Sequence, residues 1–229
     1  MVIAGVDGTR SGWVAVLCED DLSSPRVVCL DRLTDLPRRL RVVAVDIPIG
    51  LPDRGPRHAD HLARRALGPR RSAVFPTPVR AVLGARSWKE ACRRNARADG
   101  RRVSKQTFAI LPKISEADAF VRSVPWARRT LYEVHPELSF ATLAGAPMSH
   151  AKKSPAGRAE RLAVISATFG HDAFDNAYAH VRGHRVGWDD LADAFALAWT
   201  AARIRAGVAK PHPAELAVDS EGVPMRIWT

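Results

Sequence analysis

The stretch VAVDIPIGLP (residues 43–52) runs an apolar strand directly into a carboxylate, Asp46. Pro48 and Pro52 then prevent the strand from continuing, because proline lacks the N–H group that a sheet ladder needs. The strand itself, VVAV, is continuously apolar, which is typical of a central strand covered on both faces of its sheet. The stretch therefore predicts an α/β fold in which a charged side chain ends a buried strand.

Four other segments also predict strands, which would give a sheet of five together with this one. VIAGVD (residues 2–7) and GWVAVLC (residues 12–18) are joined by a GTRS turn, which predicts an antiparallel hairpin. PRVVCLDRL (residues 25–33) predicts a third strand, the stretch around Asp46 is the fourth, and RTLYEVH (residues 129–135) predicts a fifth. The sequence thus predicts a mixed five-stranded sheet flanked by helices.

Helical patterns fill the rest of the chain. Residues 53–128 carry polar helical patterns broken by Gly and Pro clusters, so we expect a mainly helical insertion there. Three later segments also predict helices: HPELSFATLAG, SPAGRAERLAVISATFG and WDDLADAFALAWTAARI. Between residues 194 and 202 the last of these has one polar residue, Thr200, so it is expected to pack in the interior.

Composition favours one domain over residues 1–229. The chain has 229 residues and 46% hydrophobic content, enough to bury one substantial core. No apolar run approaches the roughly 20 residues that cross a bilayer, so we expect a cytoplasmic protein without a membrane partner. Cys18, Cys29 and Cys92 form no CxxC pair, which argues against a zinc ribbon or a disulfide framework.

Positive charge is concentrated in the insertion. Residues 53–129 hold 19 Lys and Arg against 6 Asp and Glu, whereas the rest of the chain holds 16 against 18. Such a segment can bind phosphates, which indicates a nucleic-acid partner, although ordinary solvated helices of an Arg-rich protein would also be basic. Trp88, Phe108 and Trp126 could stack on bases or belong to the core. The candidate substrate-binding residues are Arg70, Arg71, Lys105, Lys113, Lys152 and Lys153.

Acidic residues fall at the predicted strand ends. Alternation along the strands places Asp7 and Asp46 at the ends of buried rows, at the edge where open α/β sheets usually bind ligands. Glu133 of the fifth strand is expected near the same edge. On the last helix Asp190 and Asp193 are three residues apart and point the same way. If these acids converge, their repulsion must be offset, and a divalent cation with oxygen ligands would do so.

Asp7, Asp46 and Asp193 are therefore the candidate metal ligands for Mg²⁺ or Mn²⁺, with Asp190 and Glu133 as further ligands or base-orienting groups. His135 is a candidate for moving a proton. Each has a structural alternative. Asp7 and Asp46 could bond turn amides, Asp189 and Asp190 could serve the helix N-terminus, Glu133 could pair with an Arg, and His135 could be a core histidine.

The order of these acids resembles the ribonuclease H-like fold, and DDLADAFALAWTAAR is similar to the final catalytic helix of Holliday-junction resolvases. More closely, GVDGTRSGW, VDIPIGLP, SAVFPTP, PKISEAD, EVHPELSF and KKSPAGRAER together resemble the domain of unknown function 429 family, whose members are predicted ribonuclease H-like nucleases. The resemblance covers nearly the whole chain and implies a strand order of 3-2-1-4-5 with a metal-dependent site. The insertion is larger than in simple ribonuclease H-like nucleases, so the resemblance implies no particular substrate.

We therefore expect a Mg²⁺- or Mn²⁺-dependent nuclease that hydrolyses phosphodiester bonds by a two-metal-ion mechanism. Two other functions stay open. A non-catalytic nucleic-acid-binding module could keep the same fold without needing convergent acids. A hydrolase of a small phosphorylated metabolite could use the basic insertion to enclose its ligand.

Overall fold

The five predicted strands form one mixed sheet in the computed structural model, which describes residues 1–229. The strand order is β3-β2-β1-β4-β5. β1 (Ile3–Gly8) pairs antiparallel with β2 (Trp13–Cys18), which pairs antiparallel with β3 (Arg26–Leu30). On its other side β1 pairs parallel with β4 (Val42–Val45), and β4 pairs parallel with β5 (Leu131–Glu133). The predicted fold class and strand order are confirmed.

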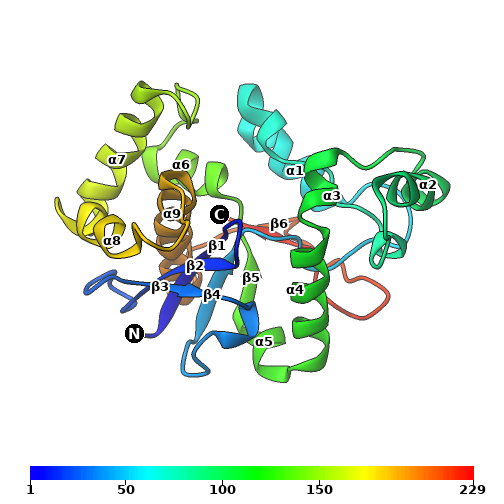
Figure 1. Cartoon of the computed structure of the whole chain (residues 1–229), viewed down its shortest axis with the longest axis horizontal. Helices are drawn as coiled ribbons and strands as arrows, with labels where there is room; N and C mark the ends of the chain where they lie inside the picture. Colours follow the sequence, from blue (N-terminus) through cyan, green and yellow to red (C-terminus); the bar gives the residue numbers. More distant parts are fainter.

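Helices cover both faces of this sheet (Figure 1). On one face lies α9 (Trp188–Arg205), accompanied by α6 (Pro136–Ala144), α7 (Pro155–Phe169) and α8 (Ala173–Val181). Alternate side chains of β1, β2 and β4 form a continuous apolar cluster with these helices. The long apolar helix α9 is therefore interior, as its composition predicts.

The insertion covers the opposite face. Its elements include no strand, which matches the predicted helical character of residues 53–128. Side chains of α2, α4 and α5 pack against the other set of alternate strand residues, so the insertion closes the core on that face. Its elements are α1 (His58–Leu67), η2 (Gly68–Ala73), η3 (Arg80–Val82), α2 (Trp88–Asp99), α3 (Lys105–Ala109), α4 (Leu111–Ser123) and α5 (Pro125–Thr130).

α9 approaches β1 closely because Gly5 has no side chain. A Cβ atom at Gly5 would lie 2.1 Å from both the Ala194 carbonyl oxygen and the Ala198 amide nitrogen. Both are backbone atoms inside a packed helix, so neither can move aside alone. This contact fixes the distance between the last helix and the central strand.

Three short elements and one helix are absent from the sequence-based expectations. These are η1 (Leu33–Asp35), α8, and a small antiparallel pair of β6 (Pro211–His212) and β7 (Ile227–Trp228). Strands of two residues carry no detectable period, so alternation cannot predict them. None of the helices is both long and apolar enough to span a membrane.

Candidate functional site

Asp7 and Asp46 lie side by side at the carboxyl ends of the two central parallel strands. In the register of β1 and β4, Gly5 lies opposite Ala44. The Asp46 N–H group donates to the Val6 carbonyl over 3.1 Å, which extends the ladder by one residue. Because side chains alternate along a strand, both carboxylates point to the face that α9 covers.

Helix α9 brings two more carboxylates to this edge. Asp190 and Asp193 lie in its first two turns, three residues apart, and therefore on one side of the helix. The close packing of α9 at Gly5 holds that side against the strand that ends in Asp7. Asp193 is almost completely buried, with 3% of its surface exposed.

Repulsion among these acids is visible in their pKa values. Burial, and then Asp193, Asp46 and Asp190, raise the pKa of Asp7 well above its usual range. Burial raises the pKa of Asp46 to about 7 and that of Asp193 to about 6, while Lys152 opposes both shifts. Burial also raises the pKa of Asp190. Asp7, Asp46, Asp190 and Asp193 thus interact as one group, called here the acid cluster.

One ammonium group lies within the acid cluster. Lys152 Nζ is 2.9 Å from Asp193 Oδ2. Burial opposes its charge, but Asp193 and Asp7 raise the pKa of Lys152 above its usual value, so it stays protonated. The loop that carries Lys152 is held in place, because Arg161 Nη1 donates to the His150 carbonyl over 3.3 Å. Lys152 is therefore a built-in counter-ion of the acids.

A second lysine, Lys113 of α4, reaches the same edge from the insertion. Its Nζ donates to the Gly12 carbonyl over 2.5 Å and lies 4.5 Å from the centroid of the Trp13 ring. Burial lowers the pKa of Lys113, while Asp7 and Asp190 are among the groups that oppose this shift. This ammonium group is therefore within electrostatic range of the acid cluster.

The other candidate substrate-binding residues make no ion pair or hydrogen bond with the acid cluster. Lys105 instead places its Nζ 5.7 Å from the centroid of the Trp88 ring. Arg71 and Lys153 are exposed, and Arg70 is half-buried. In this structure these side chains therefore do not offset the charge of the acid cluster by direct contact.

Glu133 lies on the other face of the sheet. It pairs with Val45, the residue before Asp46, so its side chain points away from the acid cluster. There Glu133 Oε1 lies 2.5 Å from Arg57 Nη2, and Oε2 accepts a hydrogen bond of 2.7 Å from the Ile49 N–H group. The structural alternative, a pair with an arginine, is the one observed. Glu133 rather than Asp46 therefore holds the turn that follows Asp46.

Both ring nitrogens of His135 bind backbone. Nδ1 accepts a hydrogen bond of 3.2 Å from the Glu137 N–H group at the start of α6, and Nε2 lies 3.3 Å from the Ala73 carbonyl oxygen. Since Nδ1 accepts, the proton is on Nε2 and the ring is neutral. Burial also lowers the pKa of His135. This arrangement is that of a helix cap, and we assign no proton transfer to His135.

Two members of the acid cluster also serve local structure. Asp7 Oδ1 accepts from the Gly8 N–H group over 2.8 Å, and Asp190 Oδ2 accepts from the Gly187 N–H group over 3.0 Å. Gly187 is the N-cap residue of α9 and Asp190 bonds back to it, so Asp190 serves the helix N-terminus and Asp189 is not its N-cap. Each of these hydrogen bonds occupies one oxygen of its carboxylate, so the second oxygen does not take part in it.

The acid cluster fits a divalent cation by its chemistry. Asp193 Oδ1 is buried without a hydrogen-bond partner. Carboxylate oxygens are preferred ligands of Mg²⁺ and Mn²⁺, and a cation would relieve the repulsion that raises the pKa of Asp7. As they stand, no three His, Cys, Asp or Glu side chains are arranged to hold a metal ion. Binding would therefore require rotation of these side chains, and the unpartnered Asp193 Oδ1 is the oxygen open to an ion while Oδ2 faces Lys152.

The comparisons with known proteins show a family without supplying a function. No curated protein and no solved structure matches the chain. One family model does match, over residues 5–217, and its description is protein of unknown function, DUF429. Because the match spans nearly the whole chain, this protein belongs to the DUF429 family.

Proposed function

We propose that this protein is a Mg²⁺- or Mn²⁺-dependent nuclease whose active site is the acid cluster. The observation that supports this most directly is the buried convergence of four carboxylates at the carboxyl ends of β1 and β4. Such a group is costly without a cation, because like charges in a buried site raise one another's pKa. Carboxylates in this position are suited to metal-assisted phosphodiester hydrolysis.

Three acids, Asp7, Asp46 and Asp193, bind the metal in this proposal. Asp190 is a further ligand or orients the catalytic base. A bound ion would activate a water molecule and stabilise the leaving oxygen. Lys113 and Lys152 would offset the negative charge of the cluster and contact the phosphate oxygens of the substrate. Both ammonium groups already lie in electrostatic contact with the acids, which supports this role.

A nucleic-acid-binding module of the same fold is the second candidate. The ion pair between Lys152 and Asp193 favours it, since this pair balances part of the charge without a metal ion. A module of this kind would bind nucleic acid equally well with and without divalent cations, and it would cleave nothing.

Substitution of a cluster acid separates these two functions. Asp7→Asn preserves the shape of the side chain but removes the charge of a metal ligand. If that charge is worth about 4 kcal/mol in the transition state, cleavage slows roughly a thousandfold. We expect this loss for labelled single-stranded, double-stranded and hybrid substrates in Mn²⁺, with binding affinity in Ca²⁺ unchanged. Asp193→Asn should behave in the same way.

Asp20→Asn is the matched control. Asp20 is exposed and follows β2, which runs antiparallel to β1, so it lies at the opposite edge of the sheet from Asp7. Cleavage by this variant should equal that of the wild type. If the wild type binds but does not cut, the module is the correct function. Normal cleavage by Asp7→Asn would show that the acid cluster is not the active site.

A further inference from the structure

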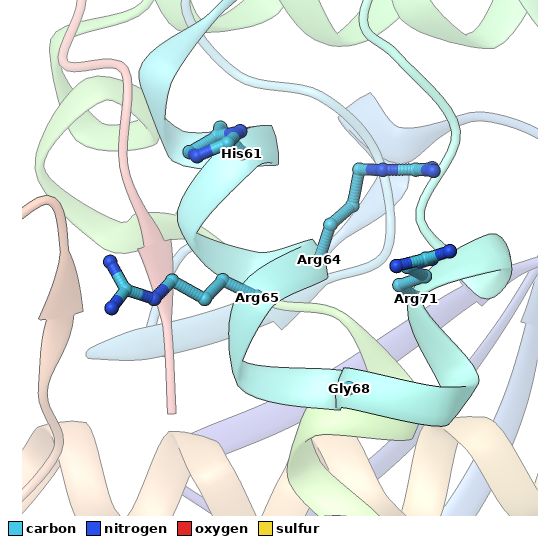
Figure 2. Close-up of a pocket in the computed structure, with 5 residues that line it drawn as sticks. All are labelled: His61, Arg64, Arg65, Gly68 and Arg71. Carbon is cyan, nitrogen blue, oxygen red and sulfur yellow. The ribbon is translucent and has the colours of Figure 1, made fainter.

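A basic pocket of about 690 Å³ lies on α1 and η2 (Figure 2). It has no apolar lining residue and is formed by His61, Arg64, Arg65, Gly68 and Arg71. None of the three arginines pairs with a carboxylate, whereas Arg57, Arg80, Arg94, Arg101 and Arg122 of the insertion do. Guanidinium groups left without a carboxylate partner are suited to bind phosphate oxygens.

The arginines of this pocket are spread out instead of converging on one point. In Figure 2, Arg64 and Arg71 extend to the same side of the helix, whereas Arg65 extends to the other. A single small anion would be held best by side chains that meet around it. Separated guanidinium groups suit successive phosphates along a strand.

The pocket is connected to the wall of the candidate active site. Arg70, next to Arg71 in η2, donates from Nε to the Met148 carbonyl over 2.9 Å, in the loop that leads to Lys152. The end of η2 also lies near the acid cluster, because the Ala73 carbonyl is a partner of the His135 ring, which is within electrostatic range of Asp193. A strand bound at the pocket would thus lie next to the acid cluster.

An exposed aromatic side chain, Phe75, comes shortly after η2 in the sequence. Phe75 is 44% exposed and is the one aromatic residue among the large apolar side chains on the surface. Its backbone is held on both sides, since Arg64 Nη1 donates to the Val74 carbonyl over 2.6 Å and the Thr77 N–H group donates to Asp60 Oδ2 over 2.6 Å. Phe75 is therefore presented to solvent by a fixed segment.

Phe75 also replaces the aromatic residues expected to stack on bases. Trp88, Phe108 and Trp126 are partly buried and pack against the apolar core of the insertion. Trp88 and Trp126 in addition donate from their indole nitrogens to backbone carbonyls. These contacts fix the three rings as parts of the fold.

We propose that this pocket and Phe75 form a binding site for single-stranded nucleic acid. Arg64, Arg65 and Arg71 bind backbone phosphates, and Phe75 stacks on a base. Stacking requires an unpaired base, so the site selects single strands over duplexes. This inference rests on the proposed function and specifies its substrate class.

Binding measured without cleavage tests this site. The probes are a fluorescent single-stranded dodecamer and a hairpin duplex of the same length, titrated in Ca²⁺ at several salt concentrations. The wild type should prefer the single strand. Phe75→Leu should weaken single-strand binding about tenfold and leave duplex binding unchanged, while Phe75→Trp should retain both. Arg71→Glu should weaken binding and lower the salt dependence by about 0.7 per lost contact.

Arg97→Glu is the matched charge control. Arg97 is exposed on α2 and has no ion-pair partner, so its reversal changes the net charge equally without touching the pocket. If Arg97→Glu and Arg71→Glu lose affinity equally, the loss is an effect of net charge and not of the pocket. That result would overturn the inference. So would a wild-type preference for the duplex, or displacement of the dodecamer by a mononucleotide at similar concentration.

The two proposals fail in different ways. If the wild type cleaves in Mn²⁺ and the pocket variants bind and cleave like it, the pocket inference is wrong and the nuclease stands. If the wild type binds neither probe, both proposals are wrong. Because Phe75 and Arg71 are exposed, their substitution should leave the melting temperature unchanged, which confirms that the variants are folded.

Discussion

Lys152 explains how four acids can lie together in the absence of a metal ion. Two carboxylates about 4 Å apart repel each other by roughly 4 kcal/mol at an effective dielectric constant near 20. The ammonium group beside Asp193 offsets part of this repulsion and opposes the pKa shifts of Asp46 and Asp193. Lys152 and a divalent cation would therefore compete for the negative charge of the same carboxylates.

This competition predicts the behaviour of Lys152→Met. Without Mn²⁺ the variant should be less stable than the wild type by about 1–2 kcal/mol, between the values of exposed and buried ion pairs. Mn²⁺ should then raise its melting temperature more than that of the wild type, since no positive charge beside Asp193 repels the ion. Lys153→Met is the control, because Lys153 is exposed and has no ion-pair partner. An equal effect of Mn²⁺ on wild type and Lys152→Met would contradict the competition.

At the scale of elements, the site depends on the packing of α9 against β1. Asp190 and Asp193 are carried by the helix, and Asp7 by the strand, so their mutual distance is set where the two elements touch. That contact is Gly5, whose missing side chain admits the helix backbone. Gly5 therefore positions the acids of the site although it has no side chain that could take part in a reaction.

Gly5→Ala should therefore damage both stability and function. The added methyl group would overlap two backbone atoms of α9, and overpacking of this kind costs about 3 kcal/mol. For a chain of this size that lowers the melting temperature by roughly 10 °C. Gly183→Ala is the control, since a Cβ atom there meets nothing within 4 Å. A Gly5→Ala protein with wild-type stability would show that α9 does not lie as close to β1 as described.

Alternation along each strand was sufficient to predict Asp7 and Asp46, because both end central strands on one face. It could not place Glu133, whose face depends on the register between β4 and β5. Register between strands is set by long-range packing, and a shift of one residue reverses the face. Lys113 reaches the acids across the sheet edge from α4, a proximity that no local pattern contains. The sequence therefore predicted the residues within each element better than the relation between elements.

At the scale of the whole molecule, the basic insertion is less available to a ligand than its charge suggests. Arg57 lies buried between Asp60 and Glu133, and Arg80 pairs with Asp118 and Asp219. Arg57 thereby ties the insertion to β5, and Arg80 ties it to the C-terminal segment that carries Asp219. The charge that remains for a ligand is concentrated in smaller surfaces, of which the pocket on α1 is one.

The stability of the whole protein should depend on pH in a way that tests the proposed metal site. The pKa of Asp46 is raised to about 7 and that of Asp193 to about 6, from ordinary values near 4. A carboxyl group with a raised folded-state pKa stabilises the fold fully below its unfolded pKa, and this contribution is lost as the pH rises through the folded value. In EDTA the stabilising contribution of these two acids should therefore be lost progressively between about pH 4 and pH 7.

Mn²⁺ should reverse this loss, because it binds the deprotonated carboxylates and competes with their protons. At a free concentration 100 times its Kd, a ligand of the folded state adds about 2.7 kcal/mol, or roughly 5–10 °C in melting temperature at this chain length. We expect that gain at pH 8, a much smaller one at pH 5, and little at either pH in Asp46→Asn. The measurement is a set of melting curves from pH 5 to pH 8 in EDTA and in millimolar Mn²⁺. Equal stabilisation at both ends of that range, or in wild type and Asp46→Asn, would place the bound ion away from the acid cluster.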